Sequence, residues 1–260
     1  MPFSQQNGIR YYTFNIFPAQ VAQAVFTRQG GVSPAPWASL NVGGGIGDDI
    51  QNVRANRIRS FQAAGRPVES VHDVWQVHSA EVVFADTPRP MDSEYRKADI
   101  LLTDNPDVTL FMRFADCTPI LLYDPQKRVV GIVHAGWLGT VRGAARVAVQ
   151  AMQKRYGSQP KDMLAAIGPS IGPDHYEVGA DVIARVKEAF GEQAETLLEA
   201  HGERVHFDLW KANRTLLEQA GVRQIEVASL CTACHLEDWY SHRGEQGNTG
   251  RFGALIGLAL

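Results

Sequence analysis

Three short segments each carry one side chain that can ligate a metal ion or act as a nucleophile. They are DVWQVHSAE with His78, FMRFADCTPI with Cys117 and GIVHAGW with His134. Two histidines and one cysteine make a three-ligand zinc site with an open fourth position, the arrangement that activates water. The intervals between them, 39 and 17 residues, match no local zinc motif. The fold must therefore bring the segments together.

Each of these residues also has an alternative interpretation. A lone cysteine such as Cys117 is most often an inert buried thiol. A histidine such as His134 can lie in the core with a ring nitrogen bonded to a carbonyl. The same pair also makes a metal-free hydrolase, with Cys117 as nucleophile and His134 as base. The residue types alone leave all of these interpretations open.

The elements around His134 suit a functional position. RVVGIV, at 128–133, is β-branched and predicts a short strand. TVRGAARVAVQAMQKRYG, at 140–157, has a polar start, helix-period apolar residues and a closing glycine, so it predicts a helix. His134 thus stands at the carboxyl end of a strand, where open α/β sheets place their chemistry. We expect His78 and Cys117 to follow strand-like runs as well.

The rest of the chain alternates strand and helix patterns. The predicted strands are 9–14, 21–28, 72–86, 98–104, 108–114, 126–136, 163–170, 224–230 and 251–260. The predicted helices are 50–65, 140–157, 179–191 and 204–221, the last entered from a short strand. Asp48 and Asp49 are candidate N-caps of the first helix, after a glycine-rich loop over 29–49 of the kind that is usually functional or mobile. This mixture predicts a single layered α/β domain over residues 1–260.

Composition excludes several classes of protein. At 260 residues and 45% apolar, the chain can bury a substantial core. A net charge of −3 gives no basic field, so a nucleic-acid polymer is not an expected partner. We find neither a membrane-spanning run nor a signal peptide, and three cysteines fit a reducing compartment. We expect a cytoplasmic protein that works away from membranes.

The CTAC segment at 231–234 resembles a CxxC motif. A four-cysteine zinc ribbon needs a second pair, and only Cys117 remains. A redox CxxC stands between a strand and a helix N-terminus, whereas loop-like sequence follows here. We therefore interpret Cys231 and Cys234 as mostly structural.

Six ordered blocks from about residue 24 to residue 257 carry a family resemblance. They are TRQGGVS…SLN…GDD…NR, QVHSAEV, ADCTPILLYDP, VHAGW, AAIGPSIGP…YEVG and WYSHRGEQGNTGR. Together they resemble the laccase-domain family of purine nucleoside phosphorylases. This family is also described as multicopper polyphenol oxidases and includes a bacterial peptidoglycan editing factor.

The resemblance implies a fold, a metal and an activity. The implied fold is a layered α/β/β/α sandwich, distantly like a cysteine-hydrolase toxin domain. It implies one zinc ion held by His78, Cys117 and His134, which are also the catalytic residues, with copper as the alternative metal. The implied activities are phosphorolysis of adenosine, inosine, guanosine and methylthioadenosine, and deamination of adenosine. The chain departs from the family pattern at Cys234 and at Leu138, where a basic residue is common, so one positive charge expected near phosphate is missing.

Nucleoside and phosphate are thus the expected small-molecule partners. Backbone amides of the helix after His134 can face an anion, reached through a turn at Gly136 and Gly139. Arg57 and Arg243 are our preferred phosphate-binding residues because they lie inside family blocks. The other candidates are Arg28, Arg113 and Arg251, and for all five the alternative is a solvated surface charge. Trp75, Phe114 and Trp137 can stack on a purine or belong to the core.

Three other functions use the same residues differently. A cysteine or metal hydrolase of this kind can release a wrongly added amino acid from a cell-wall precursor, UDP-MurNAc-amino acid. Polyphenol oxidation by copper is the second alternative, but conventional four-copper sites need paired His-x-His motifs, and the eight histidines include none. The third is a binding module with a purely structural zinc, which normally has four protein ligands.

Overall fold

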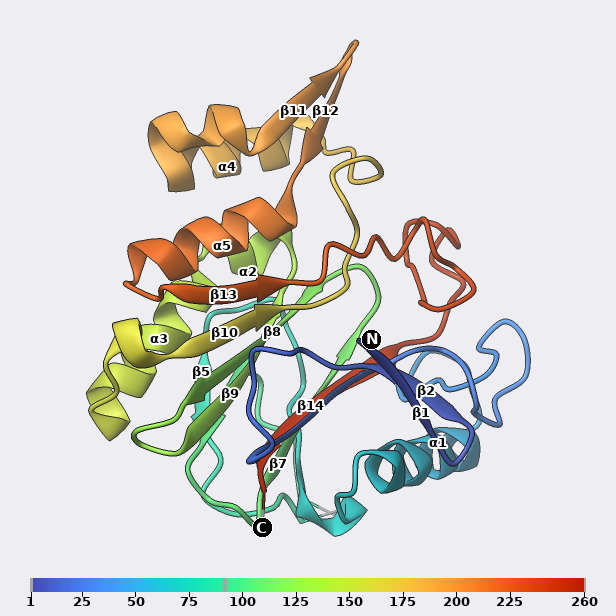
Figure 1. The fold of residues 1–260 in the computed structure, drawn as a ribbon. Helices are drawn as coiled ribbons and strands as arrows, with labels where there is room; N and C mark the ends of the chain where they lie inside the picture. The colour runs from blue at the N-terminus through green and yellow to red at the C-terminus, as the bar shows by residue number, and fades with distance from the viewer. Residues whose placement is uncertain (1, 91–92, 260) are drawn as a thin grey trace.

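The computed structural model describes residues 2–90 and 93–259, and most of its strands form two six-stranded mixed sheets (Figure 1). In order across the first sheet the strands are β1 (Phe3–Gln6), β2 (Ile9–Tyr12), β3 (Val21–Phe26), β14 (Phe252–Leu258), β7 (Thr109–Phe114) and β4 (Val71–His72). Across the second they are β13 (Gln224–Val227), β10 (Leu164–Ile167), β8 (Thr118–Asp124), β9 (Val129–Ala135), β6 (Ile100–Thr103) and β5 (Val82–Phe84). A separate hairpin pairs β11 (Leu198–His201) with β12 (Arg204–Phe207).

Helices cover the outer faces of the two sheets. They are α1 (Ile50–Ala63), α2 (Trp137–Val141), α3 (Ala144–Tyr156), α4 (Ala180–Phe190) and α5 (Leu209–Gln219). Short 3₁₀ turns are present at Val68–Ser70, Pro160–Asp162 and Gly191–Thr196. Figure 1 shows α1 on the opposite side of the sheets from α3, α4 and α5.

Three apolar cores separate four layers. Phe61 of α1 packs on Phe111 of β7, with ring centroids 5.5 Å apart, on the outer face of the first sheet. A second core lies between β7 and β14 of one sheet and β8 and β9 of the other. A third lies between the second sheet and α3 and α5. These cores confirm the expected α/β/β/α sandwich.

Strands buried on both faces explain the continuous apolar runs of the sequence. In β8, Ile120 and Leu122 face the helices, whereas Leu121 and Tyr123 face the first sheet. Side chains alternate between the faces of a strand, so a strand between two apolar layers is apolar at every position. All seven residues of β9 are buried in the same way, and His134 is the polar exception near the end of this strand.

Most predicted elements are shorter in the structure, and three of them show the main differences. The helix expected over 140–157 is two helices, because Gly143 adopts a φ of 74° between α2 and α3. The strand expected over 72–86 contains only β4 and β5, and the residues between them are irregular. The last predicted strand ends at Leu258, and its final position, 260, lies outside the described residues.

Hydrogen bonds of aspartate side chains hold the long loop over 29–49. Asp49 is the N-cap of α1, as expected, and accepts a backbone N–H of its first turn at 2.8 Å. The other candidate cap, Asp48, instead accepts the side-chain amide of Asn41 at 2.8 Å. These bonds position residues 43–46, which reach the pocket described below.

Within the part of the chain that the structure describes, none of the helices is long and apolar enough to cross a membrane.

Candidate metal centre and its pocket

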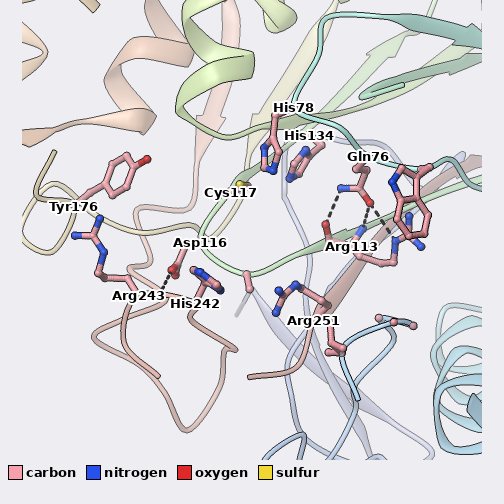
Figure 2. A pocket seen from close by; sticks show the side chains of 16 residues that line it. Gln76, His78, Arg113, Asp116, Cys117, His134, Tyr176, His242, Arg243 and Arg251 are labelled. Carbon is pink, nitrogen blue, oxygen red and sulfur yellow. Dashed lines mark hydrogen bonds between the residues drawn. The ribbon is translucent and has the colours of Figure 1, made fainter. Parts of the chain in front are cut away.

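His78, Cys117 and His134 come together at one end of the second sheet. One ligand atom from each residue lies within 4.8 Å of the other two. The two imidazole centroids are 4.9 Å apart. His134 is buried, Cys117 is half-buried and His78 is exposed, so the cluster has a protected side and an open side. Figure 2 shows the three side chains converging from different segments of the chain.

His134 lies within a strand, whereas Cys117 and His78 lie in connections. It is the penultimate residue of β9 and pairs with Pro119 of β8. Cys117 lies in the tight connection between β7 and β8, after Asp116 with a φ of 78°. His78 lies in the irregular segment between β4 and β5 with a φ of 58°. Cys117 therefore follows a strand, as expected, whereas His78 follows no strand of comparable length, because the segment after β4 is irregular and its backbone is left-handed at His78.

Asp99, one residue before β6, connects the side chain of His134 to the backbone that carries His78. Its carboxylate is buried and accepts a hydrogen bond from Nδ1 of His134 at 2.8 Å. It also accepts the backbone N–H groups of His78 at 3.1 Å and Ser79 at 2.6 Å. The bond to Nδ1 leaves Nε2 of His134 as the ligand atom. A carboxylate behind a histidine is the support that metal-binding histidines usually have.

The protein environment favours the charged forms of this group of residues. Burial alone raises the pKa of the Cys117 thiol, but the positive charge of His134 and hydrogen bonds from both histidines lower it to about 6. Burial lowers the pKa of His134, but the Cys117 thiolate and Asp99 raise it to about 9. Burial likewise opposes ionisation of Asp99, whose pKa is nevertheless lowered to about 2 by His134. Without metal, the site is therefore a thiolate beside an imidazolium.

Gly136 is required at this site for space. A Cβ atom at this position would lie 2.7 Å from Sγ of Cys117 and 3.2 Å from Nδ1 of His78. Its backbone is ordinary and extended, with φ −74° and ψ −178°, so conformational freedom is not the reason for glycine here. The turn expected at Gly136 thus serves to let the backbone pass beside the two ligands.

The open side of the cluster faces a pocket of about 540 Å³. Three guanidinium side chains line it, those of Arg113, Arg243 and Arg251. Burial lowers the pKa of Arg113 to about 10, which still leaves this guanidinium cationic at neutral pH. Residues 43–46 of the long loop complete one wall, and Figure 2 shows the other labelled side chains around the same space.

The two preferred phosphate residues are placed differently. Arg243 lines the pocket, and its Nη2 donates to the carbonyl of Glu177 at 3.0 Å. Arg57 lies outside the set of residues that line the pocket. Its Nη1 pairs with the buried carboxylate of Asp73 at 3.2 Å, and its Nε donates to the carbonyl of Val42 at 3.1 Å. Its charge therefore holds α1 against neighbouring segments.

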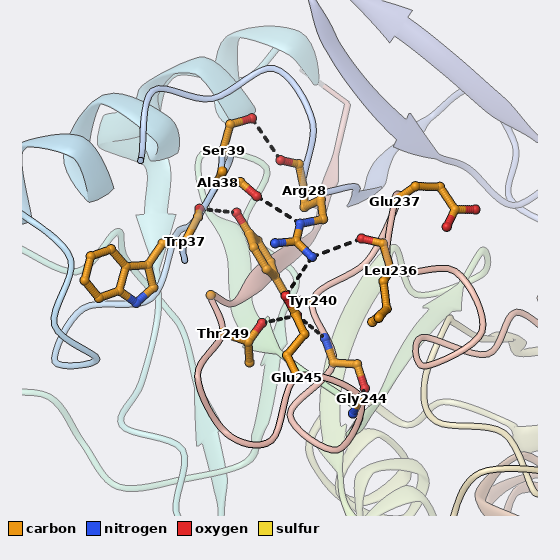
Figure 3. Close-up of polar contacts among 12 residues, drawn as sticks. Arg28, Trp37, Ala38, Ser39, Leu236, Glu237, Tyr240, Gly244, Glu245 and Thr249 are labelled. Atoms are coloured by element: carbon orange, nitrogen blue, oxygen red, sulfur yellow. Dashed lines mark hydrogen bonds and ion pairs between the residues drawn. The ribbon is translucent and has the colours of Figure 1, made fainter. Parts of the chain in front are cut away.

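Arg28 stabilises a segment that lines the pocket. Its Nη1 pairs with Glu245 at 3.0 Å, and its Nε donates to the carbonyl of Ala38 at 2.9 Å (Figure 3). The guanidinium carbon lies 4.4 Å from the ring centroid of Tyr240. These contacts fix the 240–249 segment, which supplies His242 and Arg243 to the pocket.

The three candidate aromatic residues lie in different environments. Trp75 lines the pocket and is 52% exposed. Phe114 is fully buried beside His134, with centroids 5.4 Å apart. Trp137 packs against the helical core. Tyr176, which the sequence reasoning did not single out, also lines the pocket.

Two acidic residues with supporting positions were also missed. Asp99 follows KA and precedes an apolar strand, so a lone acid at a strand start was its only signal. Asp116, beside Cys117, is buried and accepts Oγ1 of Thr232 at 2.6 Å and the backbone N–H of Arg243 at 2.6 Å. It thereby ties the ligand loop to two distant segments, which no local pattern indicates.

Comparison with known proteins gives consistent matches over nearly the whole chain. The family model described as multi-copper polyphenol oxidoreductase laccase matches residues 22–259. A protein of Deinococcus radiodurans named purine nucleoside phosphorylase is 41% identical over 238 residues, which cover 92% of this chain and 89% of the relative.

Two crystal structures share the fold. One is the hypothetical protein YfiH of Bacillus licheniformis, with a TM-score of 0.92, 34% identity and 99% of each chain covered. The other is YlmD of Geobacillus stearothermophilus, with a TM-score of 0.91 and 33% identity. That match covers 100% of this chain and 99% of the other.

Proposed function

Since this chain belongs to the multi-copper polyphenol oxidoreductase laccase family, and a relative 41% identical to it is named purine nucleoside phosphorylase, we propose that it is a metal-dependent purine nucleoside phosphorylase. Its substrates are phosphate with adenosine, inosine, guanosine or methylthioadenosine, and it also deaminates adenosine. The observation that carries the proposal is the meeting of a His–Cys–His ligand set with three guanidinium groups in one pocket.

The donor set suits zinc. Two imidazoles and one thiolate, with one side open to the pocket, correspond to catalytic zinc sites that have three protein ligands. Asp99 fixes the ring of His134 so that Nε2 can ligate. When bound, the ion supplies a Lewis acid beside the substrate. Copper is the alternative metal.

Phosphate binds to the arginines of the pocket. Among the described residues, Arg251 donates through Nη1, to the carbonyls of Thr249 at 3.2 Å and Gly250 at 2.7 Å. Its Nε and Nη2 are therefore available for a bidentate contact, the geometry in which guanidinium recognises phosphate. Arg243 adds a second positive charge. Together they hold phosphate for displacement of the purine from C1′ of the sugar.

The purine stacks on an aromatic side chain at the edge of the pocket. Trp75 presents an exposed ring there, and Tyr176 lies among the other lining residues. Ring faces of this kind accept any purine base, in agreement with a broad nucleoside range. For deamination, water replaces phosphate as the attacking group and C6 of adenine replaces C1′, with loss of ammonia.

A second candidate function is a cysteine hydrolase that cleaves an amide of a cell-wall precursor. The observation that favours it is the position of the Cys117 sulfur within 4.8 Å of a ring nitrogen of both His134 and His78, which lowers the pKa of the thiol as in an activated nucleophile. In this case Cys117 attacks the carbonyl and His134 donates the proton to the leaving amine; water then cleaves the resulting thioester, which releases the carboxylic acid and restores the Cys117 thiol.

One experiment separates the candidates. Purified protein is assayed on a nucleoside panel and on UDP-MurNAc-amino acids, with and without phosphate, before and after chelation. We expect phosphate-dependent release of free base, phosphate-independent deamination of adenosine, and loss of both on chelation while circular dichroism is unchanged. Base release that ignores phosphate, or full activity in a metal-free folded sample, would contradict the proposal. Amide hydrolysis that survives chelation would establish the second candidate, and metal analysis of the active sample identifies the ion.

A further inference from the structure

A second group of metal-capable side chains lies outside the cluster already described. Asp174 and His175 come from the connection after β10, and Cys231 and Cys234 from the connection after β13. One ligand atom from each of the four lies within 4.8 Å of all the others. The CTAC pair, which has no second cysteine pair in the sequence, thus finds a histidine and a carboxylate as additional donors.

The separations of these atoms fit a single tetrahedral ion. Zinc–ligand bonds of 2.0–2.3 Å at tetrahedral angles put neighbouring donor atoms roughly 3.4–3.8 Å apart. Nδ1 of His175 lies 3.5 Å from Sγ of Cys234 and 3.8 Å from Sγ of Cys231. Oδ2 of Asp174 lies 3.1 Å from Sγ of Cys234 and 3.0 Å from Nδ1 of His175. The two contacts of Asp174 Oδ2 are shorter than this range, so the exposed carboxylate of Asp174 must move outward by a few tenths of an ångström to complete the geometry.

The backbone around Cys231 is built to support a thiolate. Cys231 is 6% exposed, and its Sγ accepts the backbone N–H of Gly172 at 3.2 Å. Gly172 has no room for a side chain, because a Cβ atom would lie 2.6 Å from Asp174 Oδ1 and 3.1 Å from Cys231 Cβ. Hydrogen bonds to a ligating sulfur are typical supports of a metal site. Two neighbouring segments therefore approach closely at this point.

We propose that Asp174, His175, Cys231 and Cys234 bind a second, structural metal ion, a thiophilic divalent cation of the zinc class. Four protein ligands with two thiolates make a closed site, which stabilises structure and leaves no open position for substrate. The proposal does not depend on the function of the first site, since the two ligand sets share no residue.

The ion would lie where it can stabilise the substrate pocket. Tyr176, next to His175, lines the substrate pocket. Thr232, next to Cys231, donates to Asp116 beside Cys117 at 2.6 Å. An ion that cross-links the two connections therefore fixes one wall of the pocket and the loop that carries Cys117. Loss of the ion should loosen this wall without removing any group that contacts the substrate.

The test is the metal content of full-length protein purified with zinc present, measured by inductively coupled plasma mass spectrometry. We expect about one zinc ion fewer per chain in His175→Ala and in Cys234→Ser than in the unmodified protein. The matched control is His235→Ala, because His235 is equally exposed but its Nδ1 pairs with Glu237 at 3.3 Å. Cys117→Ala removes one ion from the other site, so the double variant Cys117→Ala/Cys234→Ser should bind none. If the first site binds no metal, the difference between His175→Ala and His235→Ala still remains.

Equal metal content in His175→Ala, Cys234→Ser and the unmodified protein overturns the proposal. A disulfide between Cys231 and Cys234 also overturns it, and thiol titration under denaturing, non-reducing conditions detects that bond. We expect all three thiols to react, since all three cysteines are free in the structure. Only one reactive thiol would indicate a disulfide. Thermal unfolding provides a second readout, with a lower midpoint for His175→Ala than for His235→Ala.

Discussion

At the scale of single residues, the chemistry of the first site depends on Asp99. This carboxylate gains little from solvent, because it is buried, and is stabilised instead by His134 and by backbone N–H groups. Asp99 therefore couples the backbone conformation of residues 77–79 to the orientation of the His134 ring. A group of this kind acts through its neighbours and does not contact the substrate.

We expect Asp99→Asn to weaken metal binding by about 10- to 100-fold, the usual effect of losing a supporting carboxylate. Stability should fall by about 3 kcal/mol, because breaking a buried charged pair strands its partner. Competition with a chelator and urea unfolding measure the two effects. The control is Asp86→Asn, whose side chain is 68% exposed. Metal affinity equal to that of the control would show that Asp99 has no role in positioning His134.

The charge state of Cys117 leads to a pH dependence. In chelated protein we expect iodoacetamide to modify Cys117 with a midpoint near pH 6, since the thiolate is present above its pKa of about 6 and absent below it. Peptide mass spectrometry follows Cys117 separately from the other cysteines. His134→Gln removes the positive charge, so the midpoint should rise toward the ordinary thiol value of 9.0. Restoring the metal should suppress alkylation at all these pH values. A midpoint near 9 in the unmodified protein would contradict the thiolate–imidazolium pair.

At the scale of elements, the sequence predicted those strands and helices that have a clear apolar periodicity. The buried strand with His134, the capped α1 and the strand-into-helix at α5 were all predicted from local pattern. The segment that carries His78 was not, because its path is set by bonds to Asp99, 21 residues further along the chain. Gly143 lay inside a helical pattern, and only its φ of 74° shows that it separates two helices.

Gly136 lies between β9 and α2 and beside the ligands, so its replacement tests the geometry of the site. Gly136→Ala places a methyl group 2.7 Å from Sγ of Cys117, so the ligands must move apart. We expect at least a tenfold loss of metal affinity with little change in unfolding midpoint. Gly179→Ala is the matched control, because Gly179 is also a helix N-cap with extended backbone, φ −82° and ψ 173°. Its nearest contact is the mobile end of Asp181. Unchanged metal affinity in Gly136→Ala would mean that the ligand atoms do not meet at this point.

At the scale of the whole molecule, the positive pocket could not be predicted from overall charge. The chain carries a net charge of −3, yet three arginines line one cavity, from β7, from the 240–249 segment and from the position just before β14. The sequence offered five candidate arginines with the same chemistry. Their place in the family blocks was the basis for preferring two of them. Folding decides among them, because Arg57 and Arg28 are paired with Asp73 and Glu245 while Arg243 reaches the pocket.

The same convergence predicts how phosphate is recognised. Arg251→Gln removes one guanidinium contact, which for a charge-assisted hydrogen bond is about 1.5–3 kcal/mol. We therefore expect the KM for phosphate to rise by roughly 10- to 150-fold in phosphorolysis, because each 1.4 kcal/mol is a factor of ten. Deamination of adenosine uses water in place of phosphate and should change by less than about threefold. Steady-state assays of both reactions on one preparation measure this ratio.

Two further variants make the comparison decisive. Arg185→Gln is the surface control, since its side chain is 65% exposed and pairs with Glu188 on the same helix. Arg57→Gln tests the family-based preference directly, and we expect it to lower stability, by breaking its pair with buried Asp73, while the phosphate KM is retained. If Arg57→Gln raises that KM and Arg251→Gln does not, the anion binds at Arg57 and not where the three guanidinium groups converge. If Arg251→Gln impairs both reactions equally, its side chain shapes the pocket as a whole and does not hold phosphate.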